Sequence, residues 1–195
     1  MKPTVNLSAC PSYLTVKEWT KIASLVMDNG FNSYMEVGVM KGGNLVRMSN
    51  LFELNNYDCR VTAYDCFAEL APVDPENTHT SGFQPIASVQ ATVERFGYNV
   101  EFIQALGKDA ANVIPEGVTY DVIFHDADHS YKGVYEDLVA LMPFVNKKGF
   151  VCVHDVTYDD SRSTYGGCKA LKQLVEEGKY NWVETVDSMG VLQVC

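Results

Sequence analysis

The segment from Tyr120 to Asp155 constrains the fold more than any other part of the chain. It reads YDVIFHDADHSYKGVYEDLVALMPFVNKKGFVCVHD and contains two apolar runs, at 122–124 and 150–153. An amphipathic stretch of helix length, 131–142, separates the two runs. Apolar runs that are bounded by turn residues and joined by a helix are typical of a β-α-β unit, whose two strands are parallel. The segment therefore predicts an α/β protein built on a parallel sheet.

Strands and helices are expected to alternate along the rest of the chain as well. Further strands are predicted at 33–39, 60–64, 100–104, 182–186 and 191–194. Further helices are predicted at 15–29, 43–54, 86–96, 108–113 and 167–177. This alternation predicts a Rossmann-like three-layer sandwich with a mostly parallel, seven-stranded sheet. The last two strands are close in sequence, so they are expected to form an antiparallel hairpin at the C-terminus.

The expected domain organisation is simple. The chain of 195 residues is predicted to form one domain, 1–195, in which 1–30 is a leading helical segment. Thr15 and Glu18 have the spacing of a capping box at the start of that helix. Residues 66–85 contain three prolines and several small polar side chains, so they are predicted to form a loop. Long loops beside a binding site often act as lids, and this one is interpreted in that way.

The composition excludes some classes of partner. The net charge of −10 argues against nucleic acid, because phosphate binding requires a basic surface. Acidity is compatible with a divalent cation or a small ligand, although its general effect is solubility. The chain has no apolar stretch of about 18 residues, so no membrane span is expected. The first ten residues lack the apolar core of a signal peptide and the six cysteines form no CxxC pair, so reduced thiols and a cytoplasmic location are expected.

A glycine-rich turn follows the first predicted strand. Its sequence is EVGVMKGG, in which Glu36 precedes Gly38, Gly42 and Gly43. Gly38 can adopt backbone angles that are closed to other residues, and the later pair lets a ligand approach the start of the next helix. Glu36 is placed to attract a cationic ligand group. The spacing GxxxGG differs from the GxGxxG of dinucleotide-binding proteins, which disfavours a nicotinamide dehydrogenase.

An acidic residue, Asp65, stands at the end of the second predicted strand, 27 positions after Gly38. A carboxylate at this place can accept hydrogen bonds from both hydroxyls of a ribose. A strand-end aspartate on its own is often no more than an exposed surface residue. Because Asp65 follows a glycine turn, we predict that it binds the ribose of a cofactor.

Acids and imidazoles follow both predicted strands of the segment from Tyr120 to Asp155. These polar residues are His125, Asp126, Asp128 and His129 after the first strand, and His154 and Asp155 after the second. Because ligands bind at the carboxyl ends of parallel strands, most of these side chains are expected to line a site. Carboxylates that meet there repel one another, and a bound cation is the usual compensation. His125 is interpreted as a core histidine, and Asp137 on the following helix as a solvent-facing residue.

From about residue 31 onward, the sequence resembles the class I S-adenosylmethionine-dependent methyltransferases. It is most similar to the small-molecule O-methyltransferases of the macrocin and novobiocin type, whose fourth strand ends in a D-x-D-H-S-Y signature. That signature is DADHSY here, from Asp126 to Tyr131. The glycine turn and the Asp65-Cys66-Phe67 segment also resemble their counterparts in that group. The resemblance implies methyl transfer from S-adenosylmethionine to a hydroxyl of a small molecule, with a sugar as one candidate.

The resemblance also implies roles for individual residues. The cofactor-binding residues that it implies are Glu36, Gly38, Gly42, Gly43, Asp65 and Asp126. Asp126, His154 and Asp155 would bind Mg²⁺ or another divalent metal. Asp128 would act as the general base, with His129 as the competing choice.

One departure from the family pattern affects the expected metal. The related antibiotic-modifying enzymes have an aspartate where this chain has His154. Mg²⁺ prefers oxygen ligands, so an imidazole would favour manganese, iron or zinc. A second interpretation is a non-catalytic Rossmann-like binding or scaffold protein, because few residues are left for a dedicated substrate cap. A homodimer is expected by analogy with the related sugar enzymes.

Overall fold

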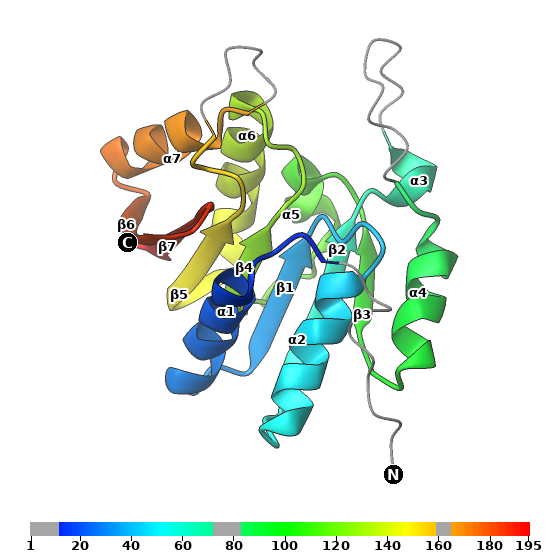
Figure 1. Cartoon of the computed structure of the whole chain (residues 1–195). Helices are drawn as coiled ribbons and strands as arrows, with labels where there is room; N and C mark the ends of the chain where they lie inside the picture. The colour runs from blue at the N-terminus through cyan, green and yellow to red at the C-terminus, as the bar shows by residue number, and fades with distance from the viewer. Residues whose placement is uncertain (1–11, 72–82, 159–164) are drawn as a thin grey trace.

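A single seven-stranded sheet forms the centre of the computed structural model, which describes residues 12–71, 83–158 and 165–195 (Figure 1). The strands in chain order are β1 (Ser33–Val37), β2 (Arg60–Asp65), β3 (Glu101–Gln104), β4 (Tyr120–His125), β5 (Val145–Val153), β6 (Tyr180–Val186) and β7 (Met189–Val194). Their order across the sheet is β3-β2-β1-β4-β5-β7-β6. Strands β1 to β5 are parallel to one another, whereas β7 is antiparallel to both β5 and β6. The predicted fold class and the C-terminal hairpin are therefore confirmed.

Helices cover both faces of this sheet, as the predicted sandwich requires (Figure 1). The α-helices are α1 (Val16–Asp28), α2 (Gly43–Leu54), α3 (Phe67–Leu70), α4 (Ile86–Arg95), α5 (Ala110–Val113), α6 (Tyr131–Leu141) and α7 (Gly167–Glu176), and the 3₁₀ helices are η3 (Gly107–Asp109) and η4 (Met142–Phe144). Helices α1, α2 and α4 lie on one face, and α5, α6 and α7 lie on the other (Figure 1).

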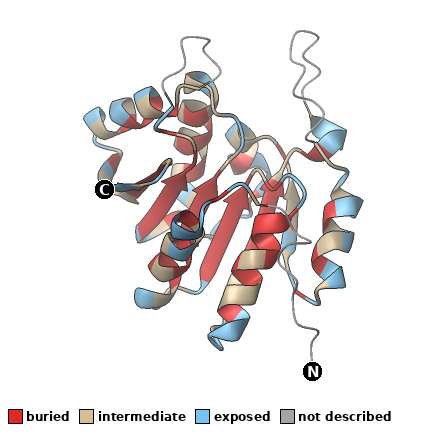
Figure 2. Cartoon of the chain, viewed as in Figure 1, coloured by how far each residue is buried: buried red, intermediate tan, exposed pale blue. Residues whose placement is uncertain are grey.

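The alternation of side chains along the strands divides the core between the two faces. On β1, Tyr34 packs in the core cluster of α1 and α2, whereas Met35 and Val37 pack in the cluster of α6 and α7. Every residue of β1 and β4 is buried, so the centre of the sheet is covered on both sides (Figure 2). This is why neither strand has a solvent-exposed polar face, and why the polar residues of the two strands are buried.

Several predicted boundaries change in the structure. The predicted helix 108–113 divides into η3 and α5, and β5 begins at Val145, five residues before the apolar run. The prediction that 66–85 is entirely a loop is wrong at its start, because 67–70 form α3 and the buried Phe67 ring anchors it in the core. Residues 72–82 of the predicted lid lie outside the described residues.

The predicted capping box of α1 is confirmed. The Glu18 backbone N–H donates to Thr15 Oγ1 over 3.2 Å, and the Thr15 N–H donates to Glu18 Oε2 over 2.8 Å. Glu18 is fully buried, although capping residues usually stay at the surface. Helix α1 packs against α2, β4 and β6, so this buried end reaches the middle of the sheet.

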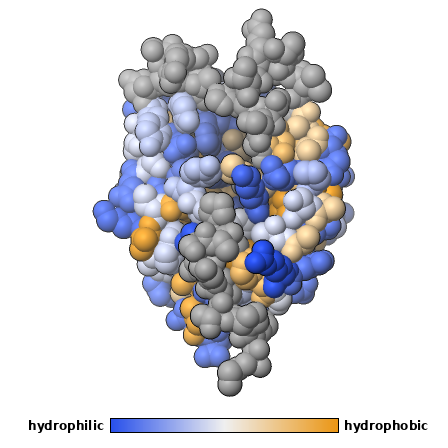
Figure 3. All heavy atoms as spheres, turned by 45° about the vertical axis from the view of Figure 1, so that its right-hand side comes forward, coloured by the Kyte–Doolittle hydropathy of each residue, from blue (hydrophilic) through white to orange (hydrophobic). Residues whose placement is uncertain are grey.

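The surface is mixed in character. Hydrophilic residues alternate with smaller hydrophobic areas in the view of Figure 3, and exposed apolar side chains such as Val16, Leu54 and Val183 are spread over several elements. Within the described residues, no helix is long and apolar enough to cross a membrane. The five described cysteines form no disulfide with one another.

Candidate functional site

The residues predicted to form a site meet at one edge of the sheet, where β1, β2, β4 and β5 end (Figure 1). The backbone is unusual at this edge. Met40 (φ 48°), Phe67 (φ 52°) and Asp155 (φ 58°) follow β1, β2 and β5 in the left-handed region, which side chains other than glycine rarely adopt. Such backbone angles persist where the surrounding structure enforces them, and they cluster at functional sites.

The glycine turn brings the end of β1 against the end of β4. Gly38 has φ +86°, and a Cβ built on it would lie 2.4 Å from the backbone oxygen of Asp126. Gly42, with φ +76°, is the N-cap of α2 and Gly43 is the first residue of that helix. The turn therefore presents the start of α2 beside the strand edge, where unpaired backbone N–H groups attract an anionic ligand group.

Asp65 joins the glycine turn to the end of β2. Its Oδ2 accepts a hydrogen bond from the Val39 N–H and its Oδ1 from the Phe67 N–H, both over 2.7 Å. These bonds account for the turn in the backbone at Phe67. A carboxylate has about four acceptor positions, so two bonds leave room for ligand hydroxyls. The predicted contact with a ribose stays a prediction.

Glu36 is buried on the α2 face of β1 and has neutral partners. Tyr34 Oη donates to Glu36 Oε2 over 3.0 Å and Asn44 Nδ2 donates to the same oxygen over 2.7 Å. Burial raises the pKa of Glu36 to about 8, helped by the charges of Asp126 and Asp65 and opposed by these two hydrogen bonds. Most of this carboxyl is therefore protonated at pH 7, and a cationic ligand group beside it would favour the ionised form.

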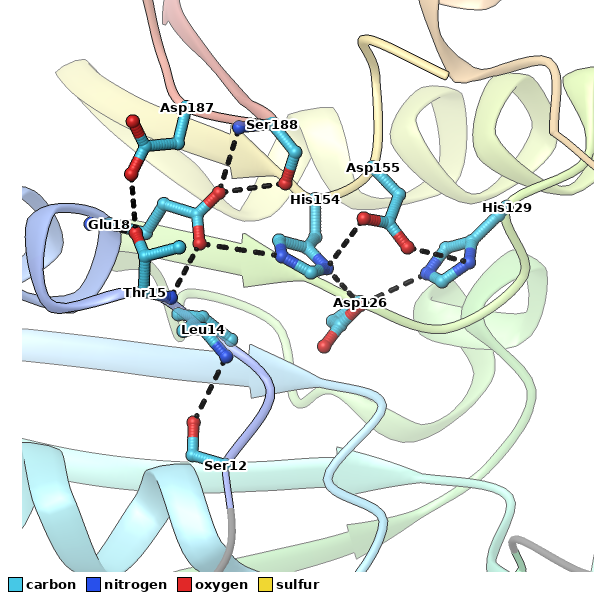
Figure 4. A network of polar contacts seen from close by, with 10 residues as sticks. All are labelled: Ser12, Leu14, Thr15, Glu18, Asp126, His129, His154, Asp155, Asp187 and Ser188. Atoms are coloured by element: carbon cyan, nitrogen blue, oxygen red, sulfur yellow. Dashed lines mark hydrogen bonds and ion pairs between the residues drawn. The ribbon is translucent and has the colours of Figure 1, made fainter. Parts of the chain in front are cut away.

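A cluster of acids and imidazoles occupies the ends of β4 and β5 (Figure 4). Asp126 Oδ1 lies 3.0 Å from His129 Nε2 and 3.1 Å from His154 Nδ1. Burial opposes the charge of Asp126, but the hydrogen bonds from the two imidazoles outweigh it and hold the pKa of this carboxyl below its ordinary value. Asp126 is therefore ionised at pH 7, unlike Glu36 on the neighbouring strand.

Two further carboxylates contact these imidazoles: Asp155 lies between the two rings, and Glu18 lies on the far side of His154 (Figure 4). Asp155 Oδ2 lies 3.6 Å from His129 Nδ1, and Asp155 Oδ1 lies 3.4 Å from His154 Nδ1. Glu18 Oε2 lies 3.6 Å from His154 Nε2. Burial lowers the pKa of His154, but Asp126, Asp155 and Glu18 together raise it to about 9. The structure thus brings together Asp126, His129, His154 and Asp155, which are four of the six polar residues named from the sequence, and adds Glu18 to them.

This cluster contains a donor set that a metal ion could use. Asp126, His129 and His154 can each offer one ligand atom, and these atoms lie within 4.8 Å of one another. The set has one oxygen and two imidazole nitrogens, which suits manganese, iron or zinc better than Mg²⁺. Carboxylates behind ligating imidazoles, as Asp155 and Glu18 are here, commonly orient such ligands.

Asp128, the predicted base, lies at the exposed start of α6. Its Oδ1 accepts from the Ser130 N–H over 2.8 Å, and Ser130 Oγ in turn accepts from the Gly133 N–H. A Cβ on Gly133 would lie 2.2 Å from Asp128 Cγ, so glycine makes room for this carboxylate. The contacts that the structure gives Asp128 belong to the helix cap, and its role as a base stays a prediction.

The residues behind the site correct one expectation. His125 is fully buried and its Nε2 lies 2.9 Å from Asp137 Oδ2, which confirms the core histidine. The expectation that Asp137 faces solvent is wrong, since this residue is buried against Gly107, where a Cβ would lie 2.3 Å from the carboxyl carbon. Gly107, the first residue of η3, was the sequence signal that a side chain packs closely against the backbone there.

Sequence reasoning missed four residues around the site. They are Glu18, Asn44, Tyr165 and Ser188. Tyr165 stacks on His129 with ring centroids 5.4 Å apart. Glu18 and Ser188 come from opposite ends of the chain, and only the capping box gave a local signal for the first.

Comparison with known proteins agrees with this arrangement. The family described as methyltransferase domain matches residues 35–156, more than half of the chain. An uncharacterized protein of Acanthamoeba polyphaga mimivirus is 25% identical over 152 residues, which are 76% of this chain. The chain spans 63% of the length of that relative.

Solved structures share the fold at low sequence identity. The O-methyltransferase NovP superposes with a TM-score of 0.69 at 19% identity, over 94% of this chain and 81% of that one. The calicheamicin methyltransferase CalS11 gives 0.64 at 15% identity, over 90% and 76%. The O-methyltransferase from Bacillus cereus, in complex with SAH (S-adenosylhomocysteine), gives 0.61 at 14% identity, over 96% and 84%. With the matched residues running from β1 to just beyond β5, the chain belongs to the methyltransferase-domain family.

Proposed function

We propose that this protein transfers a methyl group from S-adenosylmethionine to a hydroxyl of a small molecule, with a sugar as one acceptor class. The observation that carries the proposal is the shared edge of the sheet, where the glycine turn, Asp65 and the acid–imidazole cluster meet. NovP and CalS11 support this choice because both are described as methyltransferases, and CalS11 is also described as a TDP-rhamnose 3′-O-methyltransferase.

The cofactor would lie along the ends of β1 and β2. The fit rests on Gly38, which lets the glycine turn pack directly against the Asp126 backbone and so brings the turn, Asp65 and the end of β4 together. Bound S-adenosylmethionine supplies an electrophilic methyl group. Gly42 and Gly43 would offer backbone N–H groups to its amino-acid end, and Asp65 would accept from its ribose. Glu36 would pair with the cationic amino group of the cofactor, and Asp126 would line the opposite side of the cofactor site.

The acceptor hydroxyl must lose a proton for transfer to proceed. Two side chains at the rim are candidates for the general base, namely Asp128 and the partly buried His129. His129 is oriented by Asp126 and Asp155, one at each ring nitrogen, which holds the imidazole beside the strand edge. Asp128 is oriented by the Ser130 N–H. Both candidates stand in the signature on which the resemblance rests.

A divalent metal is the other means of activating a hydroxyl, since a bound ion lowers the pKa of its ligand. Asp126 and His154 would hold the ion, with Asp155 or His129 as the next ligand. The nitrogen content of this set favours manganese, iron or zinc. Asp126 and His154 contact each other directly, so an ion between them would replace a hydrogen bond that the free protein already has.

A scaffold or binding protein that keeps the cofactor fold is the second candidate. One observation favours it: the described contacts of Asp126, His129, His154 and Asp155 pair each of them with another member of the same cluster. Such a closed network is stable without a ligand. Cofactor binding without turnover over a broad panel of hydroxylated acceptors would support this second candidate.

Calorimetric titration of S-adenosylhomocysteine tests the cofactor assignment. We expect one site per chain in the unmodified protein, and an affinity at least about 100-fold lower in Asp65→Ala, because hydrogen bonds to a charged group contribute ~1.5–3 kcal/mol each. Asp58→Ala is the matched control, since this exposed aspartate precedes the same strand at its opposite end. Unchanged affinity in Asp65→Ala, at an unchanged Tm, would contradict the assignment.

Turnover then separates the two candidate bases. We expect Asp128→Asn to bind S-adenosylhomocysteine as the unmodified protein does and to lose methyl transfer by about 100-fold or more if Asp128 is the base. His129→Gln tests the alternative in the same assay. Full activity in both variants would exclude a base from this signature.

A further inference from the structure

Glu18 is a buried acid that lies outside the segment matched by the family. It is the third residue of α1, and the matched residues begin only at position 35. A helix-capping glutamate needs contact with the Thr15 N–H alone, and that contact can be made at the surface. Burying a carboxylate costs free energy unless it is paired, so its complete burial points to a role beyond the cap.

The carboxylate of Glu18 joins three distant parts of the fold (Figure 4). Its Oε1 accepts from the Ser188 N–H over 3.0 Å and from Ser188 Oγ over 2.7 Å, at the turn between β6 and β7. Its Oε2 accepts from Thr15 and faces His154 Nε2. Burial opposes the charge, but these donors and His154 hold the pKa of Glu18 below its ordinary value, so the carboxylate stays ionised.

The two oxygens of Glu18 contact different neighbours. The contact that attaches helix α1 to the β6–β7 turn is therefore distinct from the contact that orients His154. Oε1 binds the β6–β7 turn, whereas Oε2 lies 3.6 Å from His154 Nε2. On the opposite side of this ring, Nδ1 lies 3.1 Å from Asp126 Oδ1. The His154 side chain is only 8% exposed, so the carboxylates beside its two nitrogens determine the orientation of the ring.

We propose that Glu18 is a positioning residue that holds the His154 imidazole with Nδ1 towards Asp126 and the reaction site. The link to catalysis rests on the proposed function, whereas the orientation itself does not. A carboxylate behind an imidazole fixes the angle of the ring and keeps the nitrogen beside it protonated, and its loss commonly costs 10–100-fold in affinity or activity at sites that use the imidazole. Helix α1, which precedes the matched family segment, thus becomes part of the site.

Nitrogen-15 NMR of the histidine rings tests the orientation without any acceptor. Spectra of the unmodified protein, Glu18→Gln and Ser188→Ala are compared, and His154→Asn assigns the signals. We expect a protonated Nε2 of His154 in the unmodified protein. In Glu18→Gln the ring signals should shift, and the Nε2 proton should exchange with water at least about 10-fold faster, because its charged partner is lost. Ser188→Ala should leave these signals in place, since Ser188 contacts Glu18 but has no described contact with His154.

Two results would overturn the positioning role. One is an unchanged His154 spectrum in Glu18→Gln. The other is an equal change in Ser188→Ala, which would mean that Glu18 only docks the helix. If Glu18→Gln does not fold, Glu18→Asp replaces it, because this change keeps the charge and shortens the reach towards His154, and the same shift is expected.

Methyl-transfer assays keep this proposal separate from the proposed function. With an acceptor in hand, we expect kcat of Glu18→Gln to fall about 10-fold or more with little change in KM for S-adenosylmethionine. A shifted His154 spectrum in a protein that transfers no methyl group would contradict the proposed function and keep the positioning role. Transfer by the unmodified protein with identical His154 spectra in Glu18→Gln would contradict the positioning role alone.

Discussion

Two carboxyls at the ends of neighbouring strands, Glu36 buried and Asp126 partly buried, take opposite protonation states. Glu36 on β1 has a pKa raised to about 8, whereas the pKa of Asp126, directly after β4, lies below its ordinary value. Gly38 joins the two regions, because its backbone passes against the Asp126 carbonyl. Burial alone would raise both pKa values, so it cannot account for the difference.

The partners of each carboxyl account for it. Glu36 receives hydrogen bonds from a phenol and an amide, which are neutral donors. Asp126 receives them from His129 and His154, and these rings can carry positive charge. Two carboxyls with separated pKa values at one site allow different tasks, since one can accept a cationic ligand group and the other can hold imidazoles in place.

The largest expected effect is on the pH dependence of stability. The pKa of Glu36 rises from 4.5 in the unfolded chain to about 8 in the folded protein, so its stabilising protonation is complete below pH 4.5 and lost as pH rises through about 8. The free energy of unfolding should fall by up to about 4 kcal/mol over this range from this group. Urea denaturation from pH 5 to 9 should show a fall that is smaller in Glu36→Gln. The raised pKa of His154 leaves part of the fall above pH 6.5 in both proteins.

Helix α4 provides a matched control residue for this experiment. Glu94→Gln changes an exposed glutamate and should keep the pH dependence of the unmodified protein. A Glu36→Gln curve that is parallel to the unmodified one would show that Glu36 is ionised when buried, and the contrast with Asp126 would fail.

A smaller effect on the free energy of unfolding is expected when the ends of β1 and β4 are forced apart. Gly38→Ala should lower the free energy of unfolding by about 3 kcal/mol, because the new methyl group adds a backbone clash to an unfavourable φ. Gly30→Ala isolates the second cause, since Gly30 has φ +69° with nothing within 4 Å of a Cβ, and about 1 kcal/mol is expected there. Equal losses in the two variants would mean that the ends of β1 and β4 can move apart freely.

The smallest of the three effects concerns the ionised member of the pair. Asp126→Asn should lower the free energy of unfolding by about 2 kcal/mol at pH 7, because two imidazoles lose their charged acceptor. The effect is this small because the Asp126 side chain is 23% exposed and solvent screens its charge. The same acid-to-amide change at Glu36 should cost less than about 1 kcal/mol at this pH, because the acid is already mostly neutral. Chemical denaturation of both variants makes the comparison, and equal costs would contradict it.

Much of the fold could be predicted because it rests on local patterns. The apolar runs of β4 and β5, the glycine that precedes α2 and the hairpin of β6 and β7 are all visible in short windows of sequence. The grouping of Asp126 with His154 followed from a general rule, since parallel strands end at one edge of the sheet. Residues 67–70 were predicted wrongly as a loop because a short helix anchored by one buried ring leaves little periodicity.

The rest of the site depends on contacts that no local pattern contains. Glu18 meets Ser188 across 170 positions, and the capping box already explained its presence. Asp137 has the spacing of an exposed helix residue, and only the packing of α6 on β4 shows that it pairs with His125. The pKa contrast also could not be predicted, because it depends on which donors reach each carboxyl in three dimensions.

Carbon-13 NMR of the side-chain carboxyls tests the central contrast most directly. Protein labelled at the Glu and Asp carboxyl carbons would be measured at pH 6.5, with Glu36→Gln and Asp126→Asn to assign the two signals. We predict the shift of a protonated acid for Glu36 and that of a carboxylate for Asp126, since pH 6.5 lies below a pKa of about 8 and above a lowered one. Finding both groups ionised, or both protonated, would contradict the account.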